Sequence, residues 1–407
     1  MNTRVIHQIL KDTDFIHTGG SAEELKVAQY LCEKAQSLGA TAHIEPFGVQ
    51  MADVHAASLT IDGKPVTCKG YRCCGSGEIE APFVYLPDYT DVSLERVRGK
   101  IVLIDTILRY WSYNDMLDHG ALGFITYDGN VNFRDNDIDD RELRGFVANG
   151  RKALAVNINA KDAVKLVRAN PQTAKISIEQ TEYEGESRNA VAELPGQTDE
   201  WIVLTAHYDT VPLSRGSYDN MSGCIALLQV LDALAGTAPH RYGLRFVFCG
   251  SEERGLLGSK AYVAAHEAEL DKIVLNINVD MIGSVMGKFI SVVSAEEALV
   301  NYIRYTATEQ GWPIEARTGV YSSDSTPFAD KGVPALSFAR LAPPSQSSIH
   351  NRYDTTAILS DAQIARDGAF IAGFTGRLAD AVKCPVKREI PDKVREELDK
   401  YLNRKRP

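Results

Sequence analysis

The chain has 407 residues, 44% of them hydrophobic, and a formal net charge of −10 at neutral pH with acidic residues throughout. This length exceeds that of most single domains, so we expect two. The acidic balance and the lack of a basic patch interleaved with aromatic residues exclude nucleic acid as an expected partner. No apolar run could span a bilayer, and Asp12 and Asp14 stand where a secretory signal would be apolar, so no membrane attachment is expected.

The cysteines point to a reducing compartment. Their number is odd, and several have core-like neighbours, such as Cys224 in GCIALL and Cys249 in LRFVFCG. Cys73 and Cys74 are adjacent and lack the two-residue spacer of a zinc knuckle. We therefore predict reduced thiols in a cytoplasmic protein instead of a disulfide framework.

In chain order, the first predicted element is a helix over residues 20–38. Its apolar residues follow a helical period, and Ser21 with Glu24 three residues later forms a capping box. A strand over 40–49 follows, because hydrophobic and polar residues alternate there.

The pattern of predicted secondary structure changes over residues 53–183. Short strand-like runs are separated by Gly, Pro and Asp, and the one clear helix covers 161–169. This pattern predicts a separate β-rich domain. We expect it to interrupt a larger domain made of residues 1–52 and 184–385.

From residue 184 onward, strands and helices alternate. Strands are predicted at 200–207, 244–250, 273–280, 288–294 and 334–340, and long helices at 219–236, 295–311 and 360–382. This order is typical of an α/β fold with a largely parallel sheet that is covered on both faces. Residues 386–407 are expected to form a charged, helical and solvated C-terminal extension.

Metal-type side chains follow these strands. They are His207, Asp219, Glu253, Asp280 and His350, with a further acid, Glu252, directly before Glu253. Strand ends are where an α/β sheet exposes side chains to a crevice. Two imidazoles and three carboxylates would hold two divalent ions and leave the sixth acid for proton transfer. The sequence therefore predicts a metal-dependent hydrolase.

The spacing also suggests individual roles. Asp209 can orient His207 by accepting its second N–H. Asp219, on a loop twelve residues after His207, is predicted to bridge two ions, although an Asp that opens a helix is often only an N-cap. Because successive side chains diverge, Glu253 is predicted as a ligand and Glu252 as the general base.

Taken together, the motifs LTAHYDTV, SYDNMSGC, CGSEERGLLGS, NVDMIG and SIHNRYDT resemble the M28 family of co-catalytic di-zinc aminopeptidases. The resemblance implies a three-layer α/β/α sandwich around a mixed, mostly parallel sheet. It also implies that His207 and Asp280 bind one zinc ion, that Glu253 and His350 bind the other, and that Asp219 bridges both. A cis peptide bond between Asp219 and Asn220 is a further implication.

The resemblance has limits that bear on function. The inserted segment is similar to a protease-associated (PA) domain, notably in RGKIVLID and HGALGFITYD. Ser325 stands where the family pattern has a histidine, so a substrate contact from that position is not carried over. Tyr321 is a candidate donor to the reaction's oxyanion. In M20-type relatives a lid domain precedes the last histidine, and in M42-type relatives a domain precedes the bridging aspartate; this chain has room for neither.

We therefore expect an aminopeptidase that acts on peptides with a free N-terminus. Two zinc ions per chain are expected, and cobalt or manganese would suit the same ligands. A dipeptidase or carboxypeptidase of the same family, or a receptor-like relative without activity, are the alternatives. The oligomeric state is not predicted.

Overall fold

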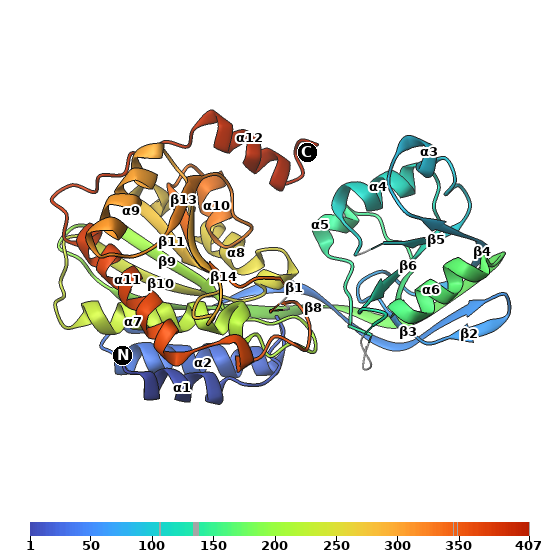
Figure 1. Cartoon of the computed structure of the whole chain (residues 1–407), viewed down its shortest axis with the longest axis horizontal. Coiled ribbons are helices and arrows are strands. Elements are labelled where there is room, and N and C mark those ends of the chain that lie inside the picture. The colour runs from blue at the N-terminus through green and yellow to red at the C-terminus, as the bar shows by residue number, and fades with distance from the viewer. Residues whose placement is uncertain (106, 133–137, 345, 348, 407) are drawn as a thin grey trace. The chain divides into compact units, whose positions relative to one another are not determined.

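Two compact units divide the chain. The computed structural model describes residues 1–105, 107–132, 138–344, 346–347 and 349–406. One unit comprises Met1–Gly48 and Glu186–Pro407, and the other comprises Val49–Gly185. The chain passes from one to the other within two long strands, β1 (Thr41–Ile61) and β8 (Thr173–Leu194), as Figure 1 shows. Among the described residues, no helix has the length and apolar character needed to span a bilayer.

The first unit is built on a mixed sheet. Its strands lie in the order β13-β12-β14-β11-β9-β10-β8. The neighbours β14, β11, β9 and β10 are parallel, as are β12 and β13, whereas β12 against β14 and β8 against β10 are antiparallel. Their bounds are β9 (Trp201–His207), β10 (Gly243–Cys249), β11 (Ile273–Val279), β12 (Lys288–Ser294), β13 (Glu315–Thr318) and β14 (Ala335–Leu341). The predicted mostly parallel sheet is confirmed.

Helices cover both faces of this sheet. Along β9, Ile202, Leu204 and Ala206 face one hydrophobic core, while Val203 faces another. This alternation is what a strand buried on both sides requires. The first core is closed by α1 (Thr3–Asp12), α2 (Ala22–Ser37), α7 (Ser222–Ala235), α9 (Glu297–Glu309) and α11 (Asp361–Ala379). The second is closed by α8 (Leu257–Ala265), α10 (Ser325–Asp330) and α12 (Asp392–Tyr401).

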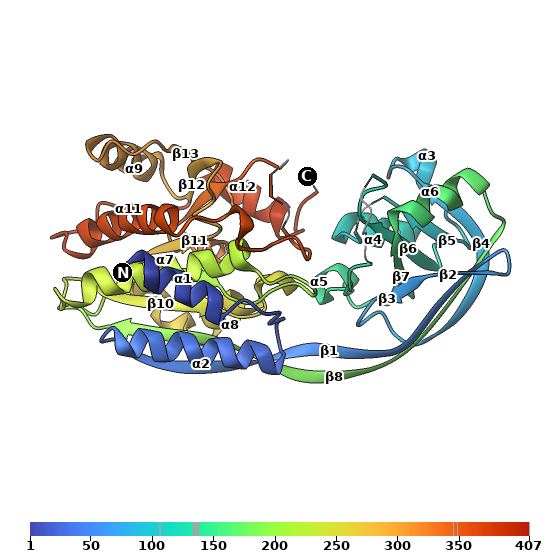
Figure 2. The same ribbon diagram turned by 60° about the horizontal axis from the view of Figure 1, so that its bottom comes forward.

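The result is a three-layer α/β/α sandwich, as predicted. Figure 2 shows α1, α7 and α11 side by side in one outer layer. Short helical turns in the described part of this unit are η1 (Ser217–Met221), η2 (Glu252–Arg254), η3 (Glu267–Lys272) and η4 (Thr356–Ile358).

The second unit has its own core and a sheet in the order β4-β5-β6-β7-β3. The pairs from β4 to β7 are parallel, and β3 is antiparallel to β7. The strands are β2 (Lys64–Val66), β3 (Cys68–Gly70), β4 (Gly77–Leu86), β5 (Ile101–Ile104), β6 (Gly123–Asp128) and β7 (Ala155–Asn159). The helices are α3 (Asp91–Leu94), α4 (Tyr110–Asp118), α5 (Gly145–Ala148) and α6 (Ala160–Ala169).

Helix α6 matches the predicted helix, but α4 is not predicted by the sequence pattern. Its residues include several aromatic and polar side chains with weak helix propensity. The helix is stabilised by tertiary packing, because Tyr113 and Met116 are fully buried in the core. None of the seven cysteines, all of which the structure describes, forms a disulfide bond.

The C-terminal helix α12 differs from the expectation. Val394 and Leu398, with the preceding Ile390, are buried in the core that contains Tyr262 and Phe328. The expectation of a solvated extension is therefore wrong for this face. The i, i+4 pair of apolar residues forms a stripe too narrow to stand out among the charged residues around it.

We predict that Leu398→Ala lowers the free energy of unfolding of the first unit by roughly 2–5 kcal/mol, because the substitution leaves a cavity in this core. Urea denaturation followed by tryptophan fluorescence would measure the change. Lys400→Ala in the same helix is the control, since its side chain is 40% exposed. Equal stability of the two variants would contradict the packing of α12.

Candidate metal centre

Three adjacent parallel strands deliver acidic and imidazole side chains to one edge of the sheet. β9 ends at His207, and Asp280 directly follows β11. Glu252 and Glu253 lie in η2, three residues beyond the end of β10. Because β10, β9 and β11 are parallel neighbours, their carboxyl ends meet at this edge.

Asp219 lies between the two histidines. His207 Nε2 is 3.0 Å from Asp219 Oδ1, and His350 Nε2 is 3.2 Å from Asp219 Oδ2. His207 Nε2 is also 3.8 Å from Asp280 Oδ1, and His350 Nε2 is 3.3 Å from Glu253 Oε2. Each oxygen of Asp219 thus faces a different imidazole, which is the arrangement a bridging carboxylate needs.

All six predicted side chains come together. Potential ligand atoms lie within 4.8 Å of one another in three groups: His207, Asp219 and Asp280; His207, Glu252 and Glu253; and Asp219, Glu253 and His350. The cis peptide bond expected between Asp219 and Asn220 is confirmed. Only His350, on the loop after β14, is more than about one third exposed, with half of its side-chain surface accessible.

The protonation behaviour of this cluster shows an excess of buried negative charge. Burial, reinforced by neighbouring carboxylates, raises the pKa of Glu252, Glu253 and Asp280 to about 8. Burial lowers the pKa of His350, but Glu253 and Asp219 outweigh it and raise that pKa to about 10.

A metal ion fits these residues. Asp280 Oδ1 is buried and accepts no hydrogen bond from the described residues. Such an oxygen, surrounded by other carboxylates, is costly to keep ionised unless a cation compensates it. Imidazole nitrogens and carboxylate oxygens are the donors that zinc and similar divalent ions accept.

Asp209 makes more contacts than the sequence suggests. The Nδ1 of His207 lies 3.2 Å from the backbone carbonyl oxygen of Asp209 and 3.7 Å from its carboxylate. That carboxylate accepts hydrogen bonds from the backbone N–H groups of Glu252 (2.8 Å) and Glu253 (3.3 Å). Asp209 thus contacts both the histidine and the backbone of the glutamate pair.

Glu24 supports the same glutamate segment from helix α2. It is fully buried and accepts hydrogen bonds from Gly20 N–H (2.9 Å) and Ser187 Oγ (2.5 Å). Ser251, which directly precedes Glu252, donates to Ser187 Oγ at 2.8 Å. The expected capping box is therefore half formed: Ser21 accepts from Glu24 N–H, but the Glu24 carboxylate turns toward the site.

Two residues near the centre differ in their surroundings. Tyr321 is partly buried beside Ile290 and Val292, and burial together with Asp280 raises its pKa. Ser325 is buried in a hydroxyl cluster, 2.9 Å from Ser323 Oγ and 3.0 Å from Ser337 Oγ. Its hydroxyl therefore has partners within the fold where the family pattern has a histidine.

Three buried acids near the centre were not among the predicted site residues: Glu24, which was expected only in a helix cap, Asp324 and Asp354. Asp324 Oδ1 accepts from Ser259 Oγ at 2.5 Å. Asp354 accepts from the backbone N–H groups of Tyr218 and Asp219. A signal existed only for Asp354, which lies within the same SIHNRYDT motif as His350.

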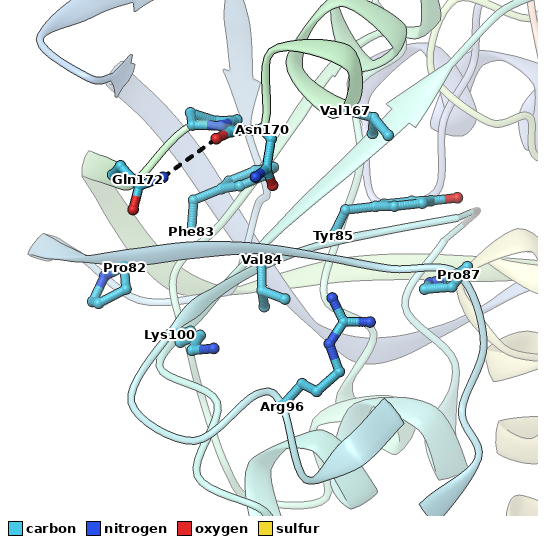
Figure 3. A pocket seen from close by; sticks show the side chains of 11 residues that line it. Pro82, Phe83, Val84, Tyr85, Pro87, Arg96, Lys100, Val167, Asn170 and Gln172 are labelled. Atoms are coloured by element: carbon cyan, nitrogen blue, oxygen red, sulfur yellow. Dashed lines mark hydrogen bonds between the residues drawn. The ribbon is translucent and has the colours of Figure 1, made fainter. Parts of the chain in front are cut away.

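The second unit contains a cavity of a different kind, with a volume of about 450 Å³. It is lined by β4 residues such as Phe83 and Tyr85, by Arg96 and Lys100, and by the end of α6 (Figure 3). No histidine, cysteine or carboxylate lines it. Among the residues that the structure describes, the groups of side chains placed to hold a metal ion all belong to the first unit.

Comparisons with known proteins agree with this geometry. Residues 189–375 match the model described as Peptidase family M28. Aminopeptidase YwaD of Bacillus subtilis is 31% identical over 191 residues, which cover 45% of this chain and 41% of that protein. Leupeptin-inactivating enzyme 1 of Streptomyces exfoliatus is 38% identical over 154 residues, covering 36% and 34%. The chain spans less than two thirds of the length of these curated relatives.

Solved structures share the whole architecture. BSAP, a zinc aminopeptidase from Bacillus subtilis, aligns with a TM-score of 0.78 at 21% identity, covering 97% of this chain and 98% of that chain. The aminopeptidase from Aneurinibacillus sp. strain AM-1 aligns with a TM-score of 0.74 at 21% identity, covering 95% and 96%. At this level of identity the likeness concerns the fold.

Glu24 provides a test of the buried contacts that support the glutamate segment. Burial raises its pKa from 4.5 to about 8, so the folded state holds a proton that the unfolded state has lost. Its contribution to stability is therefore present below about pH 4.5 and is lost as the pH rises toward 8. The Glu24→Gln side chain is neutral at every pH. We therefore predict that its free energy of unfolding rises relative to that of the unsubstituted chain as the pH increases from 5.5 to 8.5.

Urea denaturation of the metal-free proteins at both pH values would measure this difference. Glu23→Gln is the control, since that neighbouring side chain is 44% exposed on the same helix. A difference between Glu24→Gln and the unsubstituted chain that did not change with pH would contradict the buried, protonated carboxyl.

Proposed function

Because residues 189–375 form a domain of peptidase family M28, we propose that this chain is a metallo-aminopeptidase with a co-catalytic di-zinc centre. The observation that carries the proposal is the position of Asp219, whose two oxygens face the imidazoles of His207 and His350. The names of the aminopeptidase relatives and of the zinc aminopeptidase with the same fold support it.

In the proposed centre, His207 and Asp280 would hold one zinc ion, Glu253 and His350 the other, and Asp219 both. When bound, such ions act as Lewis acids that polarise the scissile carbonyl group and lower the pKa of the attacking water. Glu252 would take the proton from that water and deliver it to the leaving amine. Asp209 would keep the glutamate pair in place through its hydrogen bonds to their backbone N–H groups.

The acidic character of the site supports exopeptidase action. A substrate's free α-amine is protonated near neutral pH and is attracted to a pocket of carboxylates. Holding that ammonium group beside the reacting centre would restrict cleavage to the first peptide bond. Tyr321, near the same acids, is our candidate for a donor to the oxyanion.

The remaining parts of the chain are assigned as part of the same proposal. Residues 1–52 and 184–385 would form the catalytic domain, and 53–183 a PA-like insertion. The seven cysteines without a disulfide bond support a reducing, cytoplasmic location. The partner is a peptide with a free N-terminus.

We predict that Glu252→Gln retains zinc but loses turnover by roughly 10²-fold or more, because the amide cannot take the proton from water. Hydrolysis of an aminoacyl-anilide and zinc content by mass spectrometry would be measured together. Glu267→Gln, on the surface in η3, is the matched control and should leave turnover unchanged. Normal turnover in zinc-loaded Glu252→Gln would show that another group is the base.

A second prediction concerns the direction of attack. The protein should release the N-terminal residue from an unblocked peptide and leave the same peptide intact when its N-terminus is acetylated. A chelator should abolish the activity, and added zinc should restore it. Release of C-terminal residues from the acetylated peptide, followed by mass spectrometry, would instead indicate a carboxypeptidase.

A further inference from the structure

We propose that Asp354 is a positioning residue that holds the backbone of Asp219 and thereby fixes how the two oxygens of Asp219 are shared between the two metal positions. The proposal rests on the function proposed above. Asp354 is not a ligand candidate, because neither of its oxygens belongs to the groups that could hold an ion.

The contacts of Asp354 are directed at the backbone of two successive residues. Oδ1 accepts from Tyr218 N–H at 2.9 Å, and Oδ2 accepts from Asp219 N–H at 3.0 Å. The residue is only 2% exposed. Because the two hydrogen bonds run side by side to one carboxyl group, they restrict rotation about the axis of either bond.

The loop that carries Asp354 is itself held in shape. Asp354 N–H donates to the carbonyl of Asn351 at 3.2 Å, and Tyr353 N–H donates to Asn351 Oδ1 at 2.9 Å. Asn351 Nδ2 donates to the carbonyl of Ile349 at 2.9 Å. These bonds keep the spacing between His350 and Asp354 fixed.

One short loop therefore contacts both the side chain and the backbone of Asp219. His350 faces the Oδ2 of its carboxylate, and Asp354 accepts from its backbone N–H. Oδ1 is left to face His207 on β9. A change in the backbone orientation at Asp219 would move both of its carboxylate oxygens at once. The two hydrogen bonds that Asp354 accepts therefore control the geometry of both metal positions.

The contacts of Asp354 parallel those of Asp209, whose carboxylate accepts from the successive N–H groups of Glu252 and Glu253. In each case an aspartate outside the proposed ligand set holds the backbone of a segment that carries a ligand. Such outer hydrogen bonds orient metal ligands, and their removal typically lowers metal affinity or activity by about 10- to 100-fold. We expect Asp354 to act on Asp219 in this way.

The test uses the full chain with Asp354→Asn. The amide keeps one acceptor but points its NH₂ group at a backbone N–H, so one bond is replaced by a repulsive contact. We expect zinc affinity, measured by competition with a chromophoric chelator, to fall by about 10- to 100-fold. With saturating zinc, kcat should fall while KM for an aminoacyl-anilide changes little. Asp361→Asn, at the first turn of α11, is the matched control.

The outcomes separate this inference from the proposed function. If the unsubstituted chain neither binds zinc nor hydrolyses the substrate, the proposed function fails. If it does both, and Asp354→Asn matches it in zinc affinity and kcat, only the role of Asp354 is overturned.

A merely structural role would lower the melting temperature of the metal-free protein without changing the zinc affinity of its folded form, and this result would also overturn the inference. Should Asp354→Asn fail to fold, Asp354→Glu replaces it. That variant keeps both acceptors but displaces them by one methylene group, and unchanged zinc affinity and kcat would count against the proposal.

Discussion

The compensation of buried negative charge is the constraint on which the centre depends. Asp219 is paired with two imidazoles, whereas Glu252, Glu253 and Asp280 are carboxyl groups held away from water, and burial raises their pKa. Two histidines cannot neutralise four carboxylates. Divalent cations would balance the remaining charge. The arrangement therefore fits a metal centre better than a cluster that only stabilises the fold.

The sheet topology explains how His207, the glutamate pair and Asp280, which follow three different strands, share this site. Parallel strands have their carboxyl ends at one edge, so the residues after β9, β10 and β11 converge without any long-range loop. Helices on both faces bury the apolar side chains of these strands, and the proposed ligands follow the strands' carboxyl ends. The second unit, residues 49–185, precedes all the proposed ligands in the sequence.

Carboxyl groups outside the proposed ligand set form hydrogen bonds that hold the segments carrying the ligands. Asp209 and Asp354 each accept from two successive backbone N–H groups, and Glu24 is joined through Ser187 to Ser251. Glu24 comes from helix α2, which precedes the second unit in the chain. Helix α2 therefore helps to hold the glutamate segment in place, although it contributes no proposed ligand.

The fold class and the set of metal-type residues follow from local patterns in the order of the amino acids. Apolar runs of strand length ending in His207, in Asp280 or just before Glu253 are visible without coordinates, because a charged group at the end of a buried strand breaks the hydrophobic pattern. The helix at 161–169 and the capping residue Ser21 were visible in the same way, since both depend on local periodicity and local hydrogen bonding.

Contacts that depend on which surfaces meet are seen only in the folded chain. The packing of Val394 and Leu398, the helix at Tyr110–Asp118 and the turn of Glu24 toward Ser187 were not predictable. The same holds for the hydrogen bonds that Asp354 accepts from the backbone N–H groups of Tyr218 and Asp219, because residue types do not show which backbone group a side chain will contact. A local pattern records which side chains are apolar or charged, whereas long-range packing decides which partner each of them finds.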